Sequence, residues 1–213
     1  MCFSFESSIK SWIYALLACI LLLLISSCNQ LAVWISVFTL TFTQIQIIEA
    51  MIWRDINNGK NSDLVKYIPV LLWFQPLIQC LFGFSYSKNY LLLGLSFVYM
   101  TIILKELYSK DTFSATISED HHIIWNRYNI NNKPIFILGD SDLYILIYLL
   151  GMFIPLLFIK NNITKYVLLG YGIGSILYTG YFYKQDEFNS LWCYNAVNYV
   201  TLGIILYVTG QLY

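Results

Sequence analysis

Apolar residues in this chain occur in long blocks, without the strict alternation of a surface strand. About 20 apolar residues, at about 1.5 Å per residue, are needed for a helix to cross about 30 Å of hydrocarbon. Seven blocks approach or exceed that length: residues 11–28, 31–53, 67–85, 90–104, 143–159, 166–183 and 188–213. The pattern therefore predicts an all-α fold, a polytopic membrane bundle of about seven transmembrane helices.

The connections between the blocks differ greatly in length. Little more than Asn29 and Gln30 separates the first two spans, which predicts a tight helical hairpin. The fourth span is the shortest, because Lys105 and Glu106 interrupt it. Residues 109–140 form the one long polar connection and the expected extramembrane element. No second domain, repeat or low-complexity tail is evident, so residues 1–213 are read as a single integral membrane domain.

Composition supports a lipid environment. Hydrophobic residues make up 58% of the chain and charged residues only 11%, whereas about a quarter of a soluble domain is charged. The mean hydropathy is +0.63. Twelve basic and twelve acidic side chains cancel, and no dense basic cluster occurs, which argues against nucleic acid as a partner. The lipid bilayer is the expected partner.

The distribution of lysine and arginine predicts the orientation. With seven spans, nine of the twelve basic residues fall on the side of the amino terminus, and only Lys88, Lys160 and Lys165 fall on the other. The positive-inside rule then places the amino terminus and residues 109–140 in the cytoplasm and the carboxyl terminus outside. The sequon at Asn162 lies in a short outer loop, too close to the membrane for modification. Residues 25–28 resemble a lipobox, but six further spans favour reading this block as a span.

Glu49 is the only ionisable acid or base within the seven spans as drawn. A carboxylate inside a bilayer is costly and therefore marks a candidate functional site. At 100° per residue, Thr39, Gln46, Glu49 and Trp53 share one face of the second helix. A ligand or proton path along this face is one interpretation. The other is that Glu49, about one turn from the helix end, reaches the cytoplasmic interface and only anchors the helix.

The last span carries a second polar face, formed by Tyr194, Asn195, Asn198 and Thr201. Each asparagine amide needs several hydrogen-bond partners. These residues either join a polar site or hold helices together through interhelical hydrogen bonds.

Two smaller features concern helix geometry. In the third span, Gln75 precedes Pro76, and Gln79 follows one turn later; the proline removes a backbone hydrogen bond and predicts a kink. Asp140, Ser141 and Asp142 precede the fifth span and are interpreted as a capping cluster.

The predicted topology brings several polar residues to the cytoplasmic end of the bundle. Ser190 and Cys193, at the start of the last span, would approach the polar cluster of the second span on that side. This cluster would bind a small polar ligand or carry protons. A weaker alternative is a metal site formed by Cys2, His121, His122 and Cys193, although adjacent histidines in an acidic loop are more often solvated. No cofactor is predicted.

The sequence lacks the residues that several known classes of membrane protein require for their chemistry. A retinal protein needs a lysine in its last helix, and residues 188–213 contain none. No histidine lies within a span, so a serine–histidine dyad is missing, and no catalytic residue is assigned. A transporter or channel with a polar site around Glu49, and a non-catalytic binding or scaffolding protein whose polar residues fix helix packing, are favoured over a membrane-embedded enzyme.

Four features together resemble a family of uncharacterised bacterial multi-pass membrane proteins. They are the opening Met-Cys-Phe-Ser, Gln46-x-x-Glu49-Ala50-x-x-Trp53, the loop in which either His121 or His122 matches the family histidine, and Ser-Leu-Trp-Cys at 190–193. The resemblance extends from end to end and implies a helical membrane protein, but no established activity. Ala50 replaces the family's usual glycine. The composition, rich in asparagine, isoleucine and tyrosine, is also typical of an AT-rich genome such as that of a giant DNA virus, for which a host or virion membrane would be expected.

Overall fold

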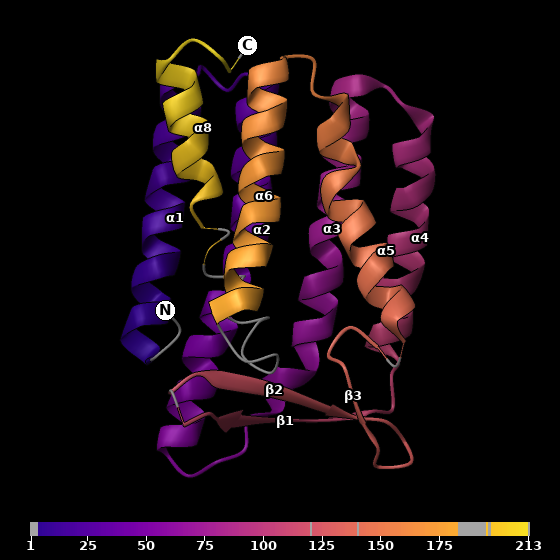
Figure 1. Ribbon diagram of the computed structural model, residues 1–213. Helices are drawn as coiled ribbons and strands as arrows, with labels where there is room; N and C mark the ends of the chain where they lie inside the picture. Colours follow the sequence, from indigo (N-terminus) through magenta and orange to yellow (C-terminus); the bar gives the residue numbers. More distant parts are fainter. Residues whose placement is uncertain (1–3, 120, 140, 183–194, 196, 213) are drawn as a thin grey trace.

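The structure is a computed structural model that describes residues 4–119, 121–139, 141–182, 195 and 197–212. Long helices stand side by side, and a small sheet crosses one end of them (Figure 1). The helices are α1 (Phe5–Ile25), α2 (Gln30–Asn57), α3 (Ile68–Ser87), α4 (Tyr90–Leu107), α5 (Asp142–Phe153), α6 (Asn162–Phe182) and α8 (Tyr199–Val208), with short 3-10 helices η1 (Asp63–Tyr67) and η2 (Pro155–Phe158). The strands are β1 (Thr112–Ile117), β2 (Ile123–Tyr128) and β3 (Pro134–Ile135).

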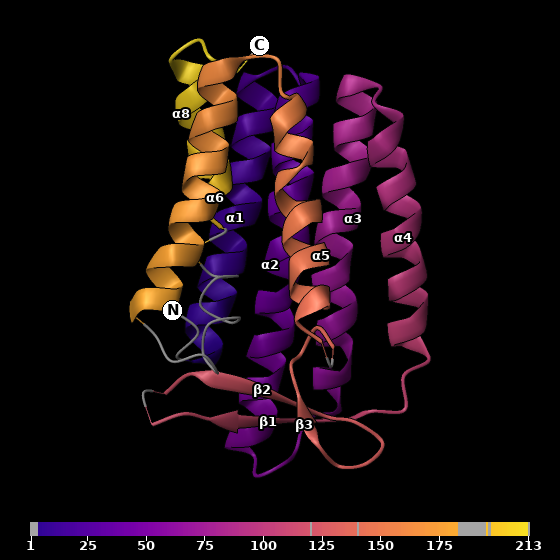
Figure 2. The same ribbon diagram turned by 45° about the vertical axis from the view of Figure 1, so that its right-hand side comes forward.

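The sheet is antiparallel, in the order β1-β2-β3. It lies across the end of the bundle where α2 ends and where η1 leads into α3, whereas the carboxyl terminus lies at the opposite end (Figures 1 and 2). The positions of β2 alternate between buried and half-buried, with Ile123, Trp125 and Arg127 buried. The sheet therefore turns one side of β2 into the protein and closes this end.

Within the described residues, four helices are long and apolar enough to cross a membrane. They are α1, α2, η1 together with α3, and α4. Helix α5 with η2, and helix α8, are shorter apolar helices. Helix α6 has 21 residues, among them several tyrosines, glycines and threonines that make it less apolar. The protein thus has the helices of a membrane protein.

The outer helices present apolar side chains to their surroundings. On α1, Leu17 is 61% exposed and Leu24 is 73% exposed, and on α4, Phe97 is 68% exposed. Only about a third of α1 and of α4 is buried. Apolar surface of this extent marks a contact with lipid or protein, which agrees with a membrane environment.

Polar side chains start the helices locally. The Ser4 hydroxyl accepts a hydrogen bond from the Ser7 amide, 3.2 Å away. The Ser7 hydroxyl accepts one from the Ser4 amide, which completes a capping box. Asn29 caps α2 by accepting from the Ala32 amide at 2.8 Å, and Asn89 likewise caps α4. Ser141 caps α5, as the sequence predicted. These caps fix the turns between apolar helices, where backbone donors would otherwise lack partners.

An aromatic cluster joins α3, α4 and α5. The Trp73 ring stacks on Tyr99, with centroids 6.2 Å apart, and meets the edges of Tyr144 and Tyr148. Gly151 allows this contact, because a Cβ at that position would overlap the Tyr99 hydroxyl and Pro76. Helix α3 continues through Pro76 and does not end there. Pro76 thus serves as a contact surface for α5.

Several expectations from the sequence need correction. The fold is not purely α-helical, because the polar connection forms a sheet. The span predicted at 143–159 is broken, since α5 ends at Phe153 and η2 begins at Pro155, whose ring cannot donate the next helical hydrogen bond. Helix α4 continues past Lys105 and Glu106 to Leu107. Of the span predicted at 188–213, the structure describes α8, Tyr199–Val208, while residues 188–194 lie outside the described residues.

Candidate functional site

A buried arginine joins the sheet to the bundle. Arg127, on β2, donates from Nε to Asp111 Oδ2 at 2.8 Å and from Nη1 to the carbonyl oxygen of Ile137 at 2.9 Å. Its Nη2 lies 2.7 Å from Asp111 Oδ2 and 2.9 Å from Glu106 Oε2. The side chains of Arg127 and Glu106 are only 4% and 2% exposed. One guanidinium therefore links the end of α4, the start of β1 and the chain before α5.

Because the Arg127 network is buried, its charges have lost their hydration and must be compensated by partners within the protein. Charges removed from water need both partners and hydrogen bonds, and a planar guanidinium can satisfy several acceptors at once. Arg127 also lies over the Phe113 ring, 5.5 Å from its centroid. Glu106 Oε2 makes its ion pair without the geometry of a hydrogen bond. The two carboxylates are consequently held at fixed positions by one cation.

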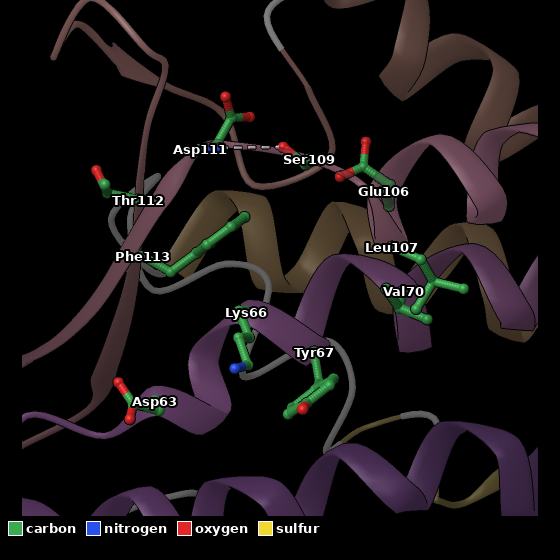
Figure 3. Close-up of a pocket in the computed structure, with 10 residues that line it drawn as sticks. All are labelled: Asp63, Lys66, Tyr67, Val70, Glu106, Leu107, Ser109, Asp111, Thr112 and Phe113. Atoms are coloured by element: carbon green, nitrogen blue, oxygen red, sulfur yellow. Dashed lines mark hydrogen bonds between the residues drawn. The ribbon is translucent and has the colours of Figure 1, made fainter.

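A cavity of about 430 Å³ opens beside these carboxylates. We call it the junction cavity. Figure 3 shows the side chains of η1 on one side of it and those of the α4 end and β1 on the other. The lining residues are Asp63, Lys66, Tyr67, Val70, Glu106, Leu107, Ser109, Asp111, Thr112 and Phe113. Its wall carries both signs of charge together with apolar surface, as sites for small polar molecules do.

A second cavity, of about 280 Å³, borders the same network. It shares Glu106, Ser109 and Asp111 with the junction cavity and adds Arg127 and Lys105. The amide of Asp111 donates to the Ser109 hydroxyl at 3.2 Å, which shapes the chain between the two hollows. The ion-pair network therefore borders two polar cavities.

The predicted site residues of α2 lie inside the bundle. Glu49 and Gln46 are fully buried, and Trp53 is 5% exposed. Gln46 Nε2 donates to Glu49 Oε2 at 3.1 Å. Helix α2 continues to Asn57, so Glu49 lies eight residues from its end, about 12 Å at about 1.5 Å per residue. The helix end is therefore further from Glu49 than the one turn expected from the sequence, and the two interpretations of Glu49, as a polar site or as an interfacial anchor, both stay predictions.

Asn195 and Asn198 precede α8, Thr201 lies within it, and Tyr194 lies outside the described residues, so the structure does not test whether the four share one helix face. The described residues contact α6 and α1. Asn195 Nδ2 donates to Thr179 Oγ1 at 3.2 Å, and the Asn195 carbonyl accepts from the Tyr171 hydroxyl at 2.6 Å. The hydroxyls of Thr201 and Tyr14 are 2.6 Å apart. Asn198 is exposed and lines a cavity of about 440 Å³ with residues of α1. These bonds connect neighbouring helices.

The glutamines of α3 also make interhelical bonds. Trp34 Nε1 donates to Gln79 Oε1 at 2.6 Å, and Gln79 Nε2 donates to the Met152 carbonyl at 3.4 Å. The Tyr148 hydroxyl donates to Gln75 Oε1. A cavity of only about 10 Å³, close to the volume that one water needs, lies beside Trp34 and Gln79. Here polar side chains bind helices α2, α3 and α5 together.

The residues of the weaker metal alternative are described only in part. His121 is exposed at the β1–β2 turn, and His122 is 2% exposed. Cys2, Cys193 and Ser190 lie outside the described residues. Among the residues that the structure describes, no group of three or more histidine, cysteine, aspartate or glutamate side chains has the arrangement of a metal site.

Sequence reasoning missed the junction cavity and its ion pairs. The sequence places Arg127 only among the basic residues of the cytoplasmic side, and Glu106 only as a charge that interrupts the fourth span. A usable signal was present, because Ile123, Trp125 and Arg127 stand at alternate positions in a run rich in β-branched and aromatic residues. An arginine at the third inward position of such a strand indicates a buried acidic partner.

Comparisons of the chain with protein-family models, with curated proteins and with solved structures gave no match. The resemblance to bacterial multi-pass membrane proteins, carried by Gln46, Glu49, Trp53 and the terminal motifs, therefore stays a prediction.

Proposed function

We propose that the protein is a multi-pass membrane protein that binds a small polar ligand in the junction cavity, at the end of the bundle covered by the sheet. The observation that carries this proposal is the buried Arg127 network, which fixes Glu106 and Asp111 at the wall of a 430 Å³ hollow. Ligand sites usually occupy about 300–1,000 Å³ and combine apolar lining with a few fixed polar groups. The interhelical hydrogen bonds of Gln75, Gln79 and Asn195 serve to connect helices.

Native mass spectrometry of the purified protein tests the proposal. The wild-type protein is expected to retain a bound non-protein mass. Thr112→Trp should lose it, because Thr112 is an exposed residue of the cavity wall and an indole there would fill the hollow. Thr116→Trp is the matched control, since it lies on the same face of β1 and outside the lining.

The proposal fails if the wild-type protein carries no bound mass. It also fails if Thr112→Trp and Thr116→Trp retain the same mass to the same extent, because occupancy would then be independent of the cavity.

The seven-span topology is part of the proposal. The N-terminal end of the bundle and the sheet would lie in the cytoplasm and the carboxyl terminus outside, as the excess of basic residues favours. A cysteine introduced at Lys133, in the turn before β3, is expected to react only with reagent on the cytoplasmic side. A cysteine introduced at Gln211 should react only from outside. Labelling of both from one side would contradict seven spans.

A second candidate function is proton or ligand passage through the bundle at Glu49. The complete burial of this carboxylate, with Gln46 as a hydrogen-bond donor, supports it. The two candidates involve different residues and can be tested separately.

A further inference from the structure

The depth of the junction cavity suggests a ligand located at the membrane surface. Its lining comes from the start of one candidate span, at Asp63, and from the end of another, at Leu107. Tyr67 and Leu107 are 43% and 53% exposed, and the neighbouring Tyr108 is 83% exposed. Tyrosines concentrate at the level of lipid headgroups. The cavity is therefore positioned to receive a headgroup whose acyl chains remain in the bilayer.

Charges around the cavity match a ligand with one cationic and one anionic group. Asp63 and Lys66 are exposed on η1, and Glu106 and Asp111 line the opposite wall (Figure 3). Arg127 pairs with both wall carboxylates, so the exposed Asp63 is the acidic group that lies open to the cavity. An ammonium group would bind the exposed Asp63 carboxylate, and a phosphate would bind Lys66, whose point charge is a common phosphate partner.

The aromatic rings discriminate between kinds of ammonium group. A quaternary ammonium is recognised by open aromatic faces. Here the Tyr67 ring lies under Lys66 Nζ, at 5.2 Å, and the Phe113 ring lies under the Arg127 guanidinium. Both rings already face a cation of the protein. A primary ammonium, with three hydrogen-bond donors for carboxylate oxygens, fits this wall better.

We propose that the junction cavity binds a ligand with a primary ammonium and a phosphate group, the chemistry of phosphoethanolamine, as a lipid headgroup or as a free molecule. This inference rests on the proposed binding function and names its ligand class. Asp63 accepts from the ammonium, while Lys66 pairs with the phosphate, assisted by the hydroxyls of Ser109 and Thr112.

Delipidated protein in detergent, titrated with defined probes and followed by native mass spectrometry, tests the inference. The probes are dioleoyl-phosphatidylethanolamine, dioleoyl-phosphatidylcholine and dioleoyl-phosphatidylglycerol. The ethanolamine lipid is expected to bind about fivefold more tightly than the other two, the factor of an exposed ion pair at the upper end of its usual range. Asp63→Asn and Lys66→Met should each weaken the binding of the ethanolamine lipid by about that factor. Lys133→Met, an exposed lysine in the turn before β3, should not.

Water-soluble phosphoethanolamine distinguishes the two sources. Displacement of the lipid by this compound at equal concentration identifies the free molecule as sufficient, whereas resistance to it identifies a lipid ligand. Equal binding of the three lipids by the wild-type protein, or unchanged binding by Asp63→Asn and Lys66→Met, overturns the inference. If these probes fail while a Thr112→Trp-sensitive bound mass persists, only the ligand class is wrong. If no such mass exists, the binding function is wrong as well.

Discussion

Arg127→Met is expected to lower the free energy of unfolding by about 3–5 kcal/mol, the usual cost of removing one partner from a buried ion pair. The methionine leaves Glu106 and Asp111 without their common cation, and the Ile137 carbonyl without its donor. The thermal midpoint of the detergent-solubilised protein should therefore fall by at least about 6 °C. The sheet, which Arg127 attaches to α4, should detach before the helices separate.

Arg54→Met is the matched control, because Arg54 is an exposed arginine in the last turn of α2. Its free energy of unfolding should change by no more than about 0.5 kcal/mol. Arg127→Lys should fall between the two, since one ammonium cannot replace the planar fork that reaches Asp111 and Ile137 together. Equal midpoints for Arg127→Met and Arg54→Met would show that the buried network contributes nothing to stability.

The long helices were predictable because their apolar blocks are physically necessary in lipid. The predicted span 31–53 lies within α2, Gln30–Asn57, and 67–85 coincides closely with α3, Ile68–Ser87. Helix ends were harder to predict. Helix α1 begins at Phe5, six residues before the predicted start, because the capping box at Ser4 extends it through polar residues that hydropathy does not count. The same limitation hid the last turn of α2.

The sheet could not be predicted from hydropathy. Its strands are short, and the inward position at Arg127 is charged, so the alternation of β2 does not register as an apolar face. The contact between Arg127 and Glu106 joins residues 21 positions apart through the folded connection, and no local pattern reports such a contact. The candidate site at Glu49 could be predicted because a lone carboxylate in an apolar block is visible in the sequence itself.

The burial of Glu49 has a physical consequence for either role of α2. A carboxylate about 12 Å from the helix end, with Gln46 as a donor, requires compensation for lost hydration. If its function is structural, an amide of the same shape should replace it, because glutamine can still accept from Gln46. If its function is proton passage, the ionisable group itself is required. The same substitution therefore separates packing from ionisation.

Glu49→Gln is expected to abolish proton flux while leaving the thermal midpoint within a few degrees of wild type. Wild-type proteoliposomes under a potassium–valinomycin potential should acidify or alkalise faster than protein-free liposomes, as reported by an internal pH dye. The variant should fall to the protein-free rate, because an amide cannot bind and release a proton near neutral pH. Glu6→Gln, which removes an exposed carboxylate near the start of α1, should retain the wild-type rate.

Three outcomes decide the role of Glu49. Flux that is lost in Glu49→Gln but kept in Glu6→Gln, at unchanged midpoint, assigns the carboxylate to the proton path. Wild-type flux equal to that of empty liposomes removes the second candidate function and leaves the junction cavity as the site of activity. A strongly lowered thermal midpoint in Glu49→Gln would mean that the charged carboxylate stabilises the bundle. Replacing a buried carboxylate by its neutral isostere destabilises a protein only where neighbouring groups stabilise the ionised form.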